Sequence, residues 1–228
     1  MEVDRDRQGA ERELRAAIRL KPGYATAHLW YAIVLIRMYE GRLDEARREL
    51  ECALDLDPLS VVANIALAEL FIRRGEPEAA VDIKRELGEL TPDHPFVWIW
   101  LGLTYAEAGQ YSRAKAATER AKGLLGSWAV MADAVRGYVY VQMGEEQQGR
   151  QILAELLQRA KGEYLPPTWL ATLYAGLGER EECFAWLEKA LHVRDPFLLV
   201  LLRWNIFNPI RGDRRFKESL AKFGTPFG

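Results

Sequence analysis

The hydrophobic residues of this chain recur at helical spacing. Residues 43–57 (LDEARRELECALDLD) illustrate the pattern, since their apolar positions fall mostly three or four residues apart: Leu43, Ala46, Leu50, Ala53 and Leu54. This spacing places one apolar stripe along a helix and leaves charged residues on its other side. Comparable segments follow one another along the chain and are separated by short stretches that contain Gly or Pro. The pattern therefore predicts an all-α fold.

A second, longer period links these segments. The glycines expected in turns, Gly41, Gly75, Gly109, Gly144 and Gly178, are separated by 34, 34, 35 and 34 residues. A small residue lies five positions after each of them: Ala46, Ala80, Ala114, Gly149 and Cys183. A period of this length predicts helical hairpins that stack on one another, because a single hairpin cannot bury its own apolar faces.

Residues 98–121 (WIWLGLTYAEAGQYSRAKAATERA) contain the most complete unit. They follow the spacing W-x2-L-G-x2-Y, then G, A and A, with Trp98, Leu101, Gly102, Tyr105, Gly109, Ala114 and Ala121. This unit resembles the tetratricopeptide repeat, in which two antiparallel helices pair. We expect the small residues Gly102 and Ala114 to let the two helices approach closely, with Tyr105 beside the contact.

The resemblance predicts a single domain, residues 1–228, that forms a right-handed α-α superhelix (TPR solenoid) of about five helix hairpins. The expected units are a half repeat at 9–22, repeats at 24–57, 59–91, 93–126, 128–161 and 163–195, and a C-terminal cap at 197–228. In the cap, Asp213 is the expected N-cap of a last helix near residues 214–222 that ends at Gly224. Lys84 occupies a position where an aromatic residue or leucine is usual, so we expect its stem to cover apolar surface while its charge stays in water.

The half repeat leaves two interpretations open. Its missing first helix indicates either a fragment of a longer array or multidomain protein, or a natural start with a degenerate cap. The second helix would then expose Leu14 and Ile18 without a partner, which makes self-association through this half repeat an alternative to consider.

A narrower resemblance concerns a bacterial subfamily. The segments LATLYAGLGEREECFAWLEKAL and RDPFLLVLL, and the ending NPIRGDRRFKESLAKFG, are similar to repeat arrays that form the C-terminal part of larger signalling proteins. Those proteins carry an N-terminal winged-helix, nucleotide cyclase or serine/threonine kinase domain. The resemblance implies a regulatory or protein-interaction role, and no such N-terminal domain is visible in this sequence.

Repeat register predicts which side chains of the first helices face a partner-binding groove. The candidate groove residues are Ile65, Glu69, Arg73, Phe96, Trp100, Leu103, Glu107, Tyr138 and Trp169. An exposed apolar surface with a few charges is typical of a peptide groove. Packing is the alternative interpretation: Trp100 and Trp169 suit the core equally well, and Glu107 and Arg73 suit a solvated surface.

Several partner classes fit the sequence poorly. Some members of the family bind a chaperone C-terminal carboxylate through inward Lys and Asn residues, but the matching positions here include Leu29, Ile33, Ile65 and Glu69. The formal net charge of −2 argues against nucleic acid. The longest apolar runs, such as residues 197–202, are too short to span a membrane. We therefore expect a protein or peptide partner, whose identity the sequence does not give.

No catalytic or cofactor pattern is evident. The histidines His28, His94 and His192 lie in different repeats, and the cysteines Cys52 and Cys183 form no paired motif, which favours a reducing, cytoplasmic setting. We expect no cofactor, no metal site and no enzyme activity. The leading hypothesis is a non-catalytic scaffold for protein–protein interaction, and the alternative is a ligand-sensing or self-associating regulatory domain.

Overall fold

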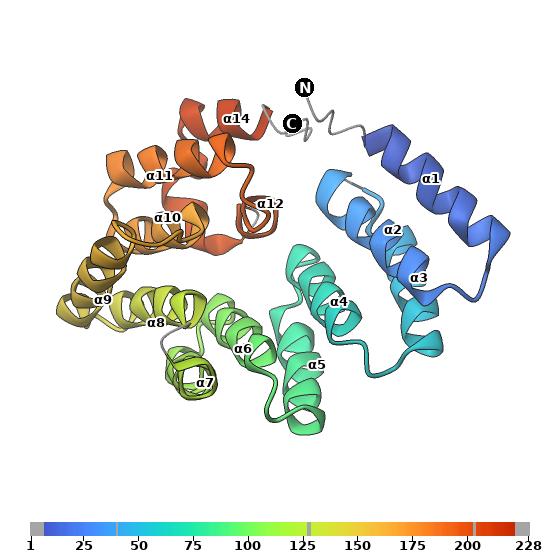
Figure 1. The fold of residues 1–228 in the computed structure, drawn as a ribbon, viewed down its shortest axis with the longest axis horizontal. Helices are drawn as coiled ribbons and strands as arrows, with labels where there is room; N and C mark the ends of the chain where they lie inside the picture. Colours follow the sequence, from blue (N-terminus) through green and yellow to red (C-terminus); the bar gives the residue numbers. More distant parts are fainter. Residues whose placement is uncertain (1–6, 40, 127–128, 203, 222–228) are drawn as a thin grey trace. The chain divides into compact units, whose positions relative to one another are not determined.

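The computed structural model describes residues 7–39, 41–126, 129–202 and 204–221, and every regular element in these ranges is a helix (Figure 1). The all-α prediction is therefore confirmed. The helices belong to two compact units: unit 1 comprises residues 1–83 and 220–228, and unit 2 comprises residues 84–219. Among the described helices, none is long and apolar enough to cross a lipid bilayer.

Unit 1 contains α1 (Arg7–Leu20), α2 (Ala25–Met38), α3 (Leu43–Leu56), α4 (Val61–Arg73) and the first half of α5 (Pro77–Leu90). Helices α2 and α3 form a hairpin, α1 packs on α2, and α4 packs on α3 and α2. The core between them is built from aliphatic side chains such as Leu35, Ile36, Leu50 and Leu70, all fully buried.

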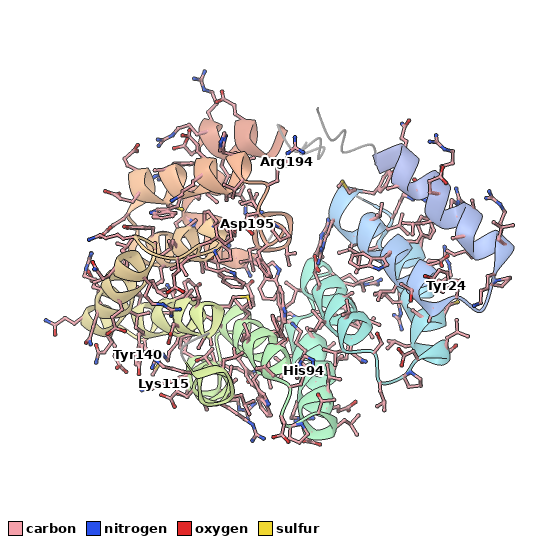
Figure 2. All side chains as sticks on the ribbon, in the orientation of Figure 1. Tyr24, His94, Lys115, Tyr140, Arg194 and Asp195 are labelled. Carbon is pink, nitrogen blue, oxygen red and sulfur yellow. The ribbon has the colours of Figure 1, made fainter. Side chains whose placement is uncertain are left out.

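Unit 2 continues from α5 with three hairpins: α6 (Pro95–Glu107) with α7 (Tyr111–Leu125), α8 (Val130–Gln142) with α9 (Glu146–Arg159), and α10 (Pro167–Leu177) with α11 (Arg180–His192). The first helices of these hairpins are neighbours, since α8 contacts both α6 and α10. Helix α7 also packs on α8, where the ammonium group of Lys115 lies 4.7 Å from the ring centroid of Tyr140 (Figure 2).

The predicted turn glycines end the first helices. Gly41, Gly75, Gly109, Gly144 and Gly178 have φ values of 78°, 77°, 70°, 81° and 74°. This left-handed conformation is strained for residues with a Cβ atom, so glycine is the residue suited to it. After Gly75, the N–H of Glu76 reaches back to the carbonyl of Phe71, 2.9 Å away, and satisfies one of the last carbonyls of α4.

The predicted small residues are all buried, and those on α3, α7, α9 and α11 belong to helices that pack on the preceding helix. Ala46, Ala80, Ala114 and Cys183 are fully buried, and Gly149 is buried too. A Cβ atom at Gly102 would lie 2.6 Å from Thr118 Cγ2 and 3.4 Å from the carbonyl oxygen of Ala114. The close approach of α6 and α7 at Gly102 and Ala114 is therefore as expected.

The C-terminal residues form α12 (Leu198–Leu201), η2 (Asn205–Phe207), α13 (Asn208–Arg211) and α14 (Arg214–Ala221). Asp213 is the N-cap of α14, as predicted: its Oδ1 accepts a hydrogen bond from the backbone N–H of Arg215 at 2.9 Å. Arg215 also pairs with Glu181 of α11 at 2.7 Å and lies over the ring of Phe184. Helix α14 thus covers part of the last hairpin, and the expected end at Gly224 lies outside the described residues.

Helix α1 is attached to unit 1 by apolar packing and by a polar network. Leu14 and Ile18 pack against the core of unit 1, so the expectation that they lack a partner is wrong. Because α1 packs on α2, its apolar stripe is partly buried within its own unit.

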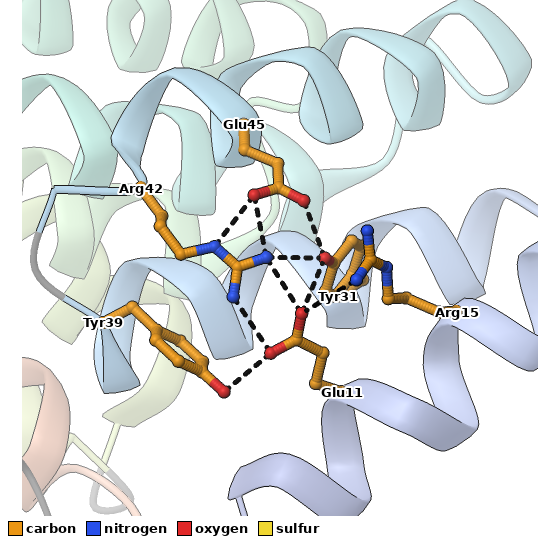
Figure 3. A network of polar contacts seen from close by, with 6 residues as sticks. All are labelled: Glu11, Arg15, Tyr31, Tyr39, Arg42 and Glu45. Atoms are coloured by element: carbon orange, nitrogen blue, oxygen red, sulfur yellow. Dashed lines mark hydrogen bonds and ion pairs between the residues drawn. The ribbon is translucent and has the colours of Figure 1, made fainter.

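The polar network centres on Glu11 (Figure 3). Its carboxylate accepts two hydrogen bonds from Arg42, each 2.9 Å long, and one of 2.6 Å from the hydroxyl group of Tyr39. Arg42 also donates to Glu45 at 2.8 Å, and the Tyr31 hydroxyl donates to Glu45 at 2.7 Å. The bond with Arg42 is the main reason that the pKa of Glu11 falls from 4.5 to about 2.

Substitution of Glu11 tests this network. A carboxylate with a lowered pKa stabilises the folded state above its unfolded pKa and loses this effect as the pH falls through the folded value. We expect Glu11→Gln to lower the free energy of unfolding by about 2–3 kcal/mol at pH 7, and by progressively less from pH 4.5 towards pH 2. Urea unfolding at several pH values measures this. Glu13→Gln on the same helix, whose side chain is 77% exposed, is the control and should change little.

Substitution of Gly149 tests the close crossing of α8 and α9. Helix propensity alone would make Gly149→Ala stabilising by about 1 kcal/mol. A Cβ atom there would lie 2.4 Å from Val141 Cγ2 and 3.0 Å from the carbonyl oxygen of Gly137, so we expect destabilisation instead. Gly123→Ala in α7 is the matched control, since nothing lies within 4 Å of that position. Thermal unfolding of both variants measures the change in stability. If Gly149→Ala is more stable than the wild type, the close approach of α8 and α9 at Gly149 is contradicted.

Candidate functional site

The predicted groove residues are divided between the two units. Ile65, Glu69 and Arg73 lie on α4 in unit 1. In unit 2, Phe96, Trp100, Leu103 and Glu107 lie on α6, Tyr138 on α8 and Trp169 on α10. The unit 2 residues therefore come from three neighbouring first helices, and we call the surface formed by α6, α8 and α10 the inner face of unit 2.

In unit 1, the charge of Glu69 is engaged within the protein. Its side chain is only 3% exposed and accepts hydrogen bonds of 3.1 and 3.4 Å from Arg37 of α2. Ile65 and Arg73 are partly exposed. Glu69 therefore links α2 to α4, while its neighbours on α4 retain some accessible surface.

In unit 2, most of the predicted groove residues are buried. Trp100 and Tyr138 are 8% exposed and Leu103 and Trp169 are fully buried, whereas Phe96 is 40% exposed. This differs from the open apolar surface expected from the sequence. At Trp100 and Trp169 the cover is provided by residues 197–202 and 204–207, which we call the C-terminal segment and which lie against the inner face of unit 2. The ring of Tyr138 lies next to Gly176 of α10.

Aromatic contacts attach the C-terminal segment to the first helices. The rings of Phe197 and Trp169 are 5.2 Å apart, and those of Trp204 and Trp100 are 5.9 Å apart. Helix α10 also contacts η2. Because Trp204 is only 1% exposed, the segment excludes water from the part of the inner face that it covers.

Lys84 completes this contact. Its ammonium group lies 5.3 Å from the ring centroid of Trp100 and 5.4 Å from that of Trp204. It donates hydrogen bonds to Thr104 Oγ1 at 2.7 Å and to the carbonyl oxygen of Trp100 at 3.2 Å. Lys84 is fully buried, so the expectation that its charge stays in water is wrong: the two indole rings and the oxygen acceptors replace water around the ammonium group.

Glu107, a predicted groove residue with a solvated surface as the alternative, binds the main chain of the C-terminal segment. Its carboxylate accepts hydrogen bonds from the backbone N–H groups of Asn205 at 2.9 Å and Ile206 at 3.3 Å. Burial raises the pKa of Glu107 from 4.5 to about 7, although these two bonds act in the opposite direction. Burial, together with the nearby Glu107, also raises the pKa of Tyr138 well above its usual value.

Arg194 and Asp195, between α11 and α12, position the start of the C-terminal segment (Figure 2). Arg194 has a positive φ of 56°, which is unusual for a residue other than glycine. The carboxylate of Asp195 is buried and accepts hydrogen bonds from the backbone N–H of Thr168 at 2.9 Å and from its hydroxyl at 2.7 Å. It also accepts one from the N–H of Phe197 at 3.0 Å, so one side chain joins the start of α10 to the segment.

Sequence analysis missed the roles of Asp195, Lys84 and Trp204 in this site. The Asp-Pro pair at residues 195–196 was a usable signal, because aspartate accepts hydrogen bonds from nearby backbone N–H groups in such turns. The position of Lys84 among apolar residues was a second signal. The pairing of Glu107 with residues nearly one hundred positions later had no local signal.

Two indole N–H groups at this site lack a hydrogen-bond acceptor among the described residues: Nε1 of Trp169 and Nε1 of Trp204, both buried. A buried donor without an acceptor destabilises the arrangement that contains it. Among the described residues, the contact between the C-terminal segment and the inner face therefore leaves these two donors without hydrogen bonds.

The described residues contain no cluster of His, Cys, Asp and Glu able to hold a metal ion. Burial raises the pKa of the Cys183 thiol to about 12, and burial with nearby carboxylates raises that of Cys52. His28 contacts Glu49 at 2.6 Å and the Pro22 carbonyl at 2.8 Å, so both of its ring nitrogens are occupied. Neither thiol has the lowered pKa of an activated nucleophile.

Comparison with known proteins identifies the class of this fold. Residues 37–98 match the family model of the tetratricopeptide repeat. A search of curated proteins finds no match. This match covers less than half of the chain; together with the helix pairing described above and the solved structures below, it places the fold in the class of tetratricopeptide-repeat solenoids.

Solved structures agree with this class. A tetratricopeptide repeat protein from Parabacteroides merdae ATCC 43184 has a TM-score of 0.58 and 21% identity, over 96% of this chain and 86% of that one. One chain of the APC/C hetero-tetramer Cut9–Hcn1 has a TM-score of 0.62 and 15% identity, over 96% and 46%. PilW, a type IV pilus biogenesis factor, has a TM-score of 0.61 and 16% identity, over 84% and 87%. Identities this low support the fold alone.

The raised pKa of Glu107 leads to a pH dependence. Between pH 4.5 and about 7 the folded protein holds a proton on Glu107 that the unfolded chain has lost, so the free energy of unfolding falls as the pH rises through this range. We expect a total change of roughly 1–3 kcal/mol from this group. Urea unfolding of the wild-type protein and of Glu107→Gln between pH 4.5 and 8 measures it. As the pH falls, the free energy of unfolding of the wild type should rise relative to that of Glu107→Gln. If the two proteins show the same dependence of this free energy on pH, the raised pKa assigned to Glu107 is contradicted.

Proposed function

We propose that this protein is a non-catalytic interaction module that binds a segment of a partner protein on the first helices of its repeats. The fold supports this, since stacked hairpins present aligned side chains from successive first helices. The observation that carries the proposal is the C-terminal segment on the inner face of unit 2. Trp100, Trp169 and Glu107 hold a stretch of polypeptide there through ring contacts and main-chain hydrogen bonds.

The accessible part of the predicted groove would take the first contacts with a partner. Phe96 is exposed, and Ile65 and Arg73 are partly exposed. In unit 2, an exposed aromatic ring suits an anchor position for a peptide, and in unit 1 the partly exposed apolar and cationic side chains lie on one helix, α4. The hetero-tetrameric Cut9–Hcn1 structure, in which a chain of similar fold assembles with others, is consistent with a protein partner.

The resemblance of the C-terminal repeats and ending to bacterial signalling proteins supports a further part of the proposal. In it, the protein is the regulatory part of a larger signalling protein, and docking on the first helices transmits the signal without bond chemistry. The self-associating alternative has lost its motivation in α1, since Leu14 and Ile18 pack within unit 1.

Peptide selection tests the proposed function. Peptides from a displayed random library are selected on the full chain, and their affinities are measured for two variants. We expect Phe96→Ala to weaken binding about tenfold, because an anchoring contact of this kind contributes about 1.4 kcal/mol. Tyr164→Ala, which removes a 68% exposed ring outside the first helices, is the matched control and should bind as the wild type does. Selected peptides that bind Phe96→Ala and Tyr164→Ala equally would place the interaction elsewhere.

A further inference from the structure

The contact between the C-terminal segment and the first helices of unit 2 resembles the binding of a peptide to a protein surface. The part of the segment that contacts α6 consists of one aromatic side chain, Trp204, followed by the turn at Asn205 and Ile206. The receiving surface consists of an indole ring, a buried cation and a half-buried carboxylate, from Trp100, Lys84 and Glu107. Trp100 and Lys84 contact the ring of Trp204, and Glu107 contacts the main chain of the turn.

We propose that Trp204–Ile206 is an intramolecular ligand of unit 2, and that the surface it covers binds external peptides of the same chemistry when it leaves. That chemistry is an aromatic side chain followed by a tight turn whose two backbone N–H groups point to Glu107. The inference rests on the proposed function and deepens it, since it specifies the class of segment that the inner face accepts and the contact that competes with it.

Trp100 and Lys84 determine the preference for an aromatic side chain. The ammonium group of Lys84 lies at nearly equal distances from the rings of Trp100 and Trp204, 5.3 and 5.4 Å. A buried cation next to one indole ring gains a second cation–π contact when another ring arrives. An aliphatic side chain at this place would exclude water but leave the cation without that second ring.

Glu107 determines the preference for a turn. A single carboxylate accepts hydrogen bonds from two successive backbone N–H groups, at Asn205 and Ile206. Successive N–H groups point to the same side only where the chain turns, because in an extended strand they alternate. The carboxylate of Glu107 thus recognises the shape of the main chain, and Trp100 with Lys84 recognises the aromatic side chain before the turn.

Trp204–Ile206 can leave without loss of the rest of the C-terminal structure, because separate contacts hold both flanks. Upstream, Asp195 is bound to Thr168 of α10. Downstream, α14 is attached to α11 through Arg215 and Glu181, and Phe207 packs towards Phe216 of α14. None of these contacts involves Trp100, Lys84 or Glu107.

The covered state also has features that favour exchange. The indole N–H groups of Trp204 and Trp169 have no acceptor among the described residues. The intervening helices α12 and α13 have four residues each and η2 has three, so no long helix must break when the turn moves. An incoming peptide with a carbonyl or carboxylate near its aromatic residue would supply an acceptor that the described residues do not offer these indole groups.

Hydrogen exchange of the unmodified full chain tests whether the turn opens by itself. We expect the amides of residues 205–207 to exchange at least 100-fold faster than the central amides of α8, with little dependence on low urea concentrations. Exchange at the rate and with the urea dependence of α8 would show that the turn opens only on global unfolding, and would overturn the inference.

Binding of a peptide in trans tests the chemistry of the site. The probe is a labelled peptide with the sequence of residues 203–212, RWNIFNPIRG. We expect the full-chain variant Trp204→Ala, whose own ring no longer competes, to bind the probe at least tenfold more tightly than the wild type. Addition of Trp100→Ala should abolish this gain. Trp186→Ala, which removes a ring of α11 outside the inner face, is the matched control and should bind like the wild type.

Equal affinity of the probe for wild type and a folded Trp204→Ala variant would overturn the inference. If circular dichroism shows that Trp204→Ala does not fold, the exchange experiment on the unmodified chain decides. Neither experiment needs an external partner. Their failure would therefore leave the proposed function standing, whereas displayed peptides that ignore Phe96 would contradict the proposed function and leave Trp204–Ile206 as an internal ligand.

Discussion

The structure depends on the close approach of the two helices in each hairpin. At each turn a glycine with positive φ reverses the chain, and five residues later a small residue is buried. The crossing of α8 and α9 has the least space, because Gly149 lies against Val141 and the main chain of Gly137. Larger residues there would separate the paired helices and shift the first helices whose side chains form the inner face of unit 2.

Both units combine apolar packing with charged groups that are partly or fully buried and have partners. In unit 1, Arg42 and Glu11 join α1 to the loop before α3, and Arg37 joins Glu69 across α2 and α4. In unit 2, Lys84 and Glu107 hold Trp204 and the turn after it. Replacing Arg37, for example, would leave the buried carboxylate of Glu69 without its partner, which is costly. Such contacts therefore help to specify which segments lie together.

The C-terminal segment limits how much of the inner face of unit 2 is accessible to a partner. A surface of apolar and aromatic side chains would be costly to leave in water. Here the chain covers part of that surface with Trp204 and Phe197, while Phe96 stays exposed. A partner segment that docks on unit 2 would therefore compete with the protein's own residues, and its apparent affinity would depend on how often the face is free.

Local sequence patterns were sufficient to predict the helices, the four hairpins formed by α2–α3, α6–α7, α8–α9 and α10–α11, the turn glycines and the N-cap at Asp213. These features depend on local spacing, since a helical stripe, a residue with positive φ and a capping carboxylate each act within a few positions of the chain. Sequence register also predicted which residues lie on the first helices. Local patterns could not show that Trp100 and Trp169 are covered, that Lys84 is buried and that Glu107 binds Asn205 and Ile206. Those outcomes depend on where residues 197–207 lie, and the position of a segment with only short helices is determined by long-range contacts rather than by its own periodicity.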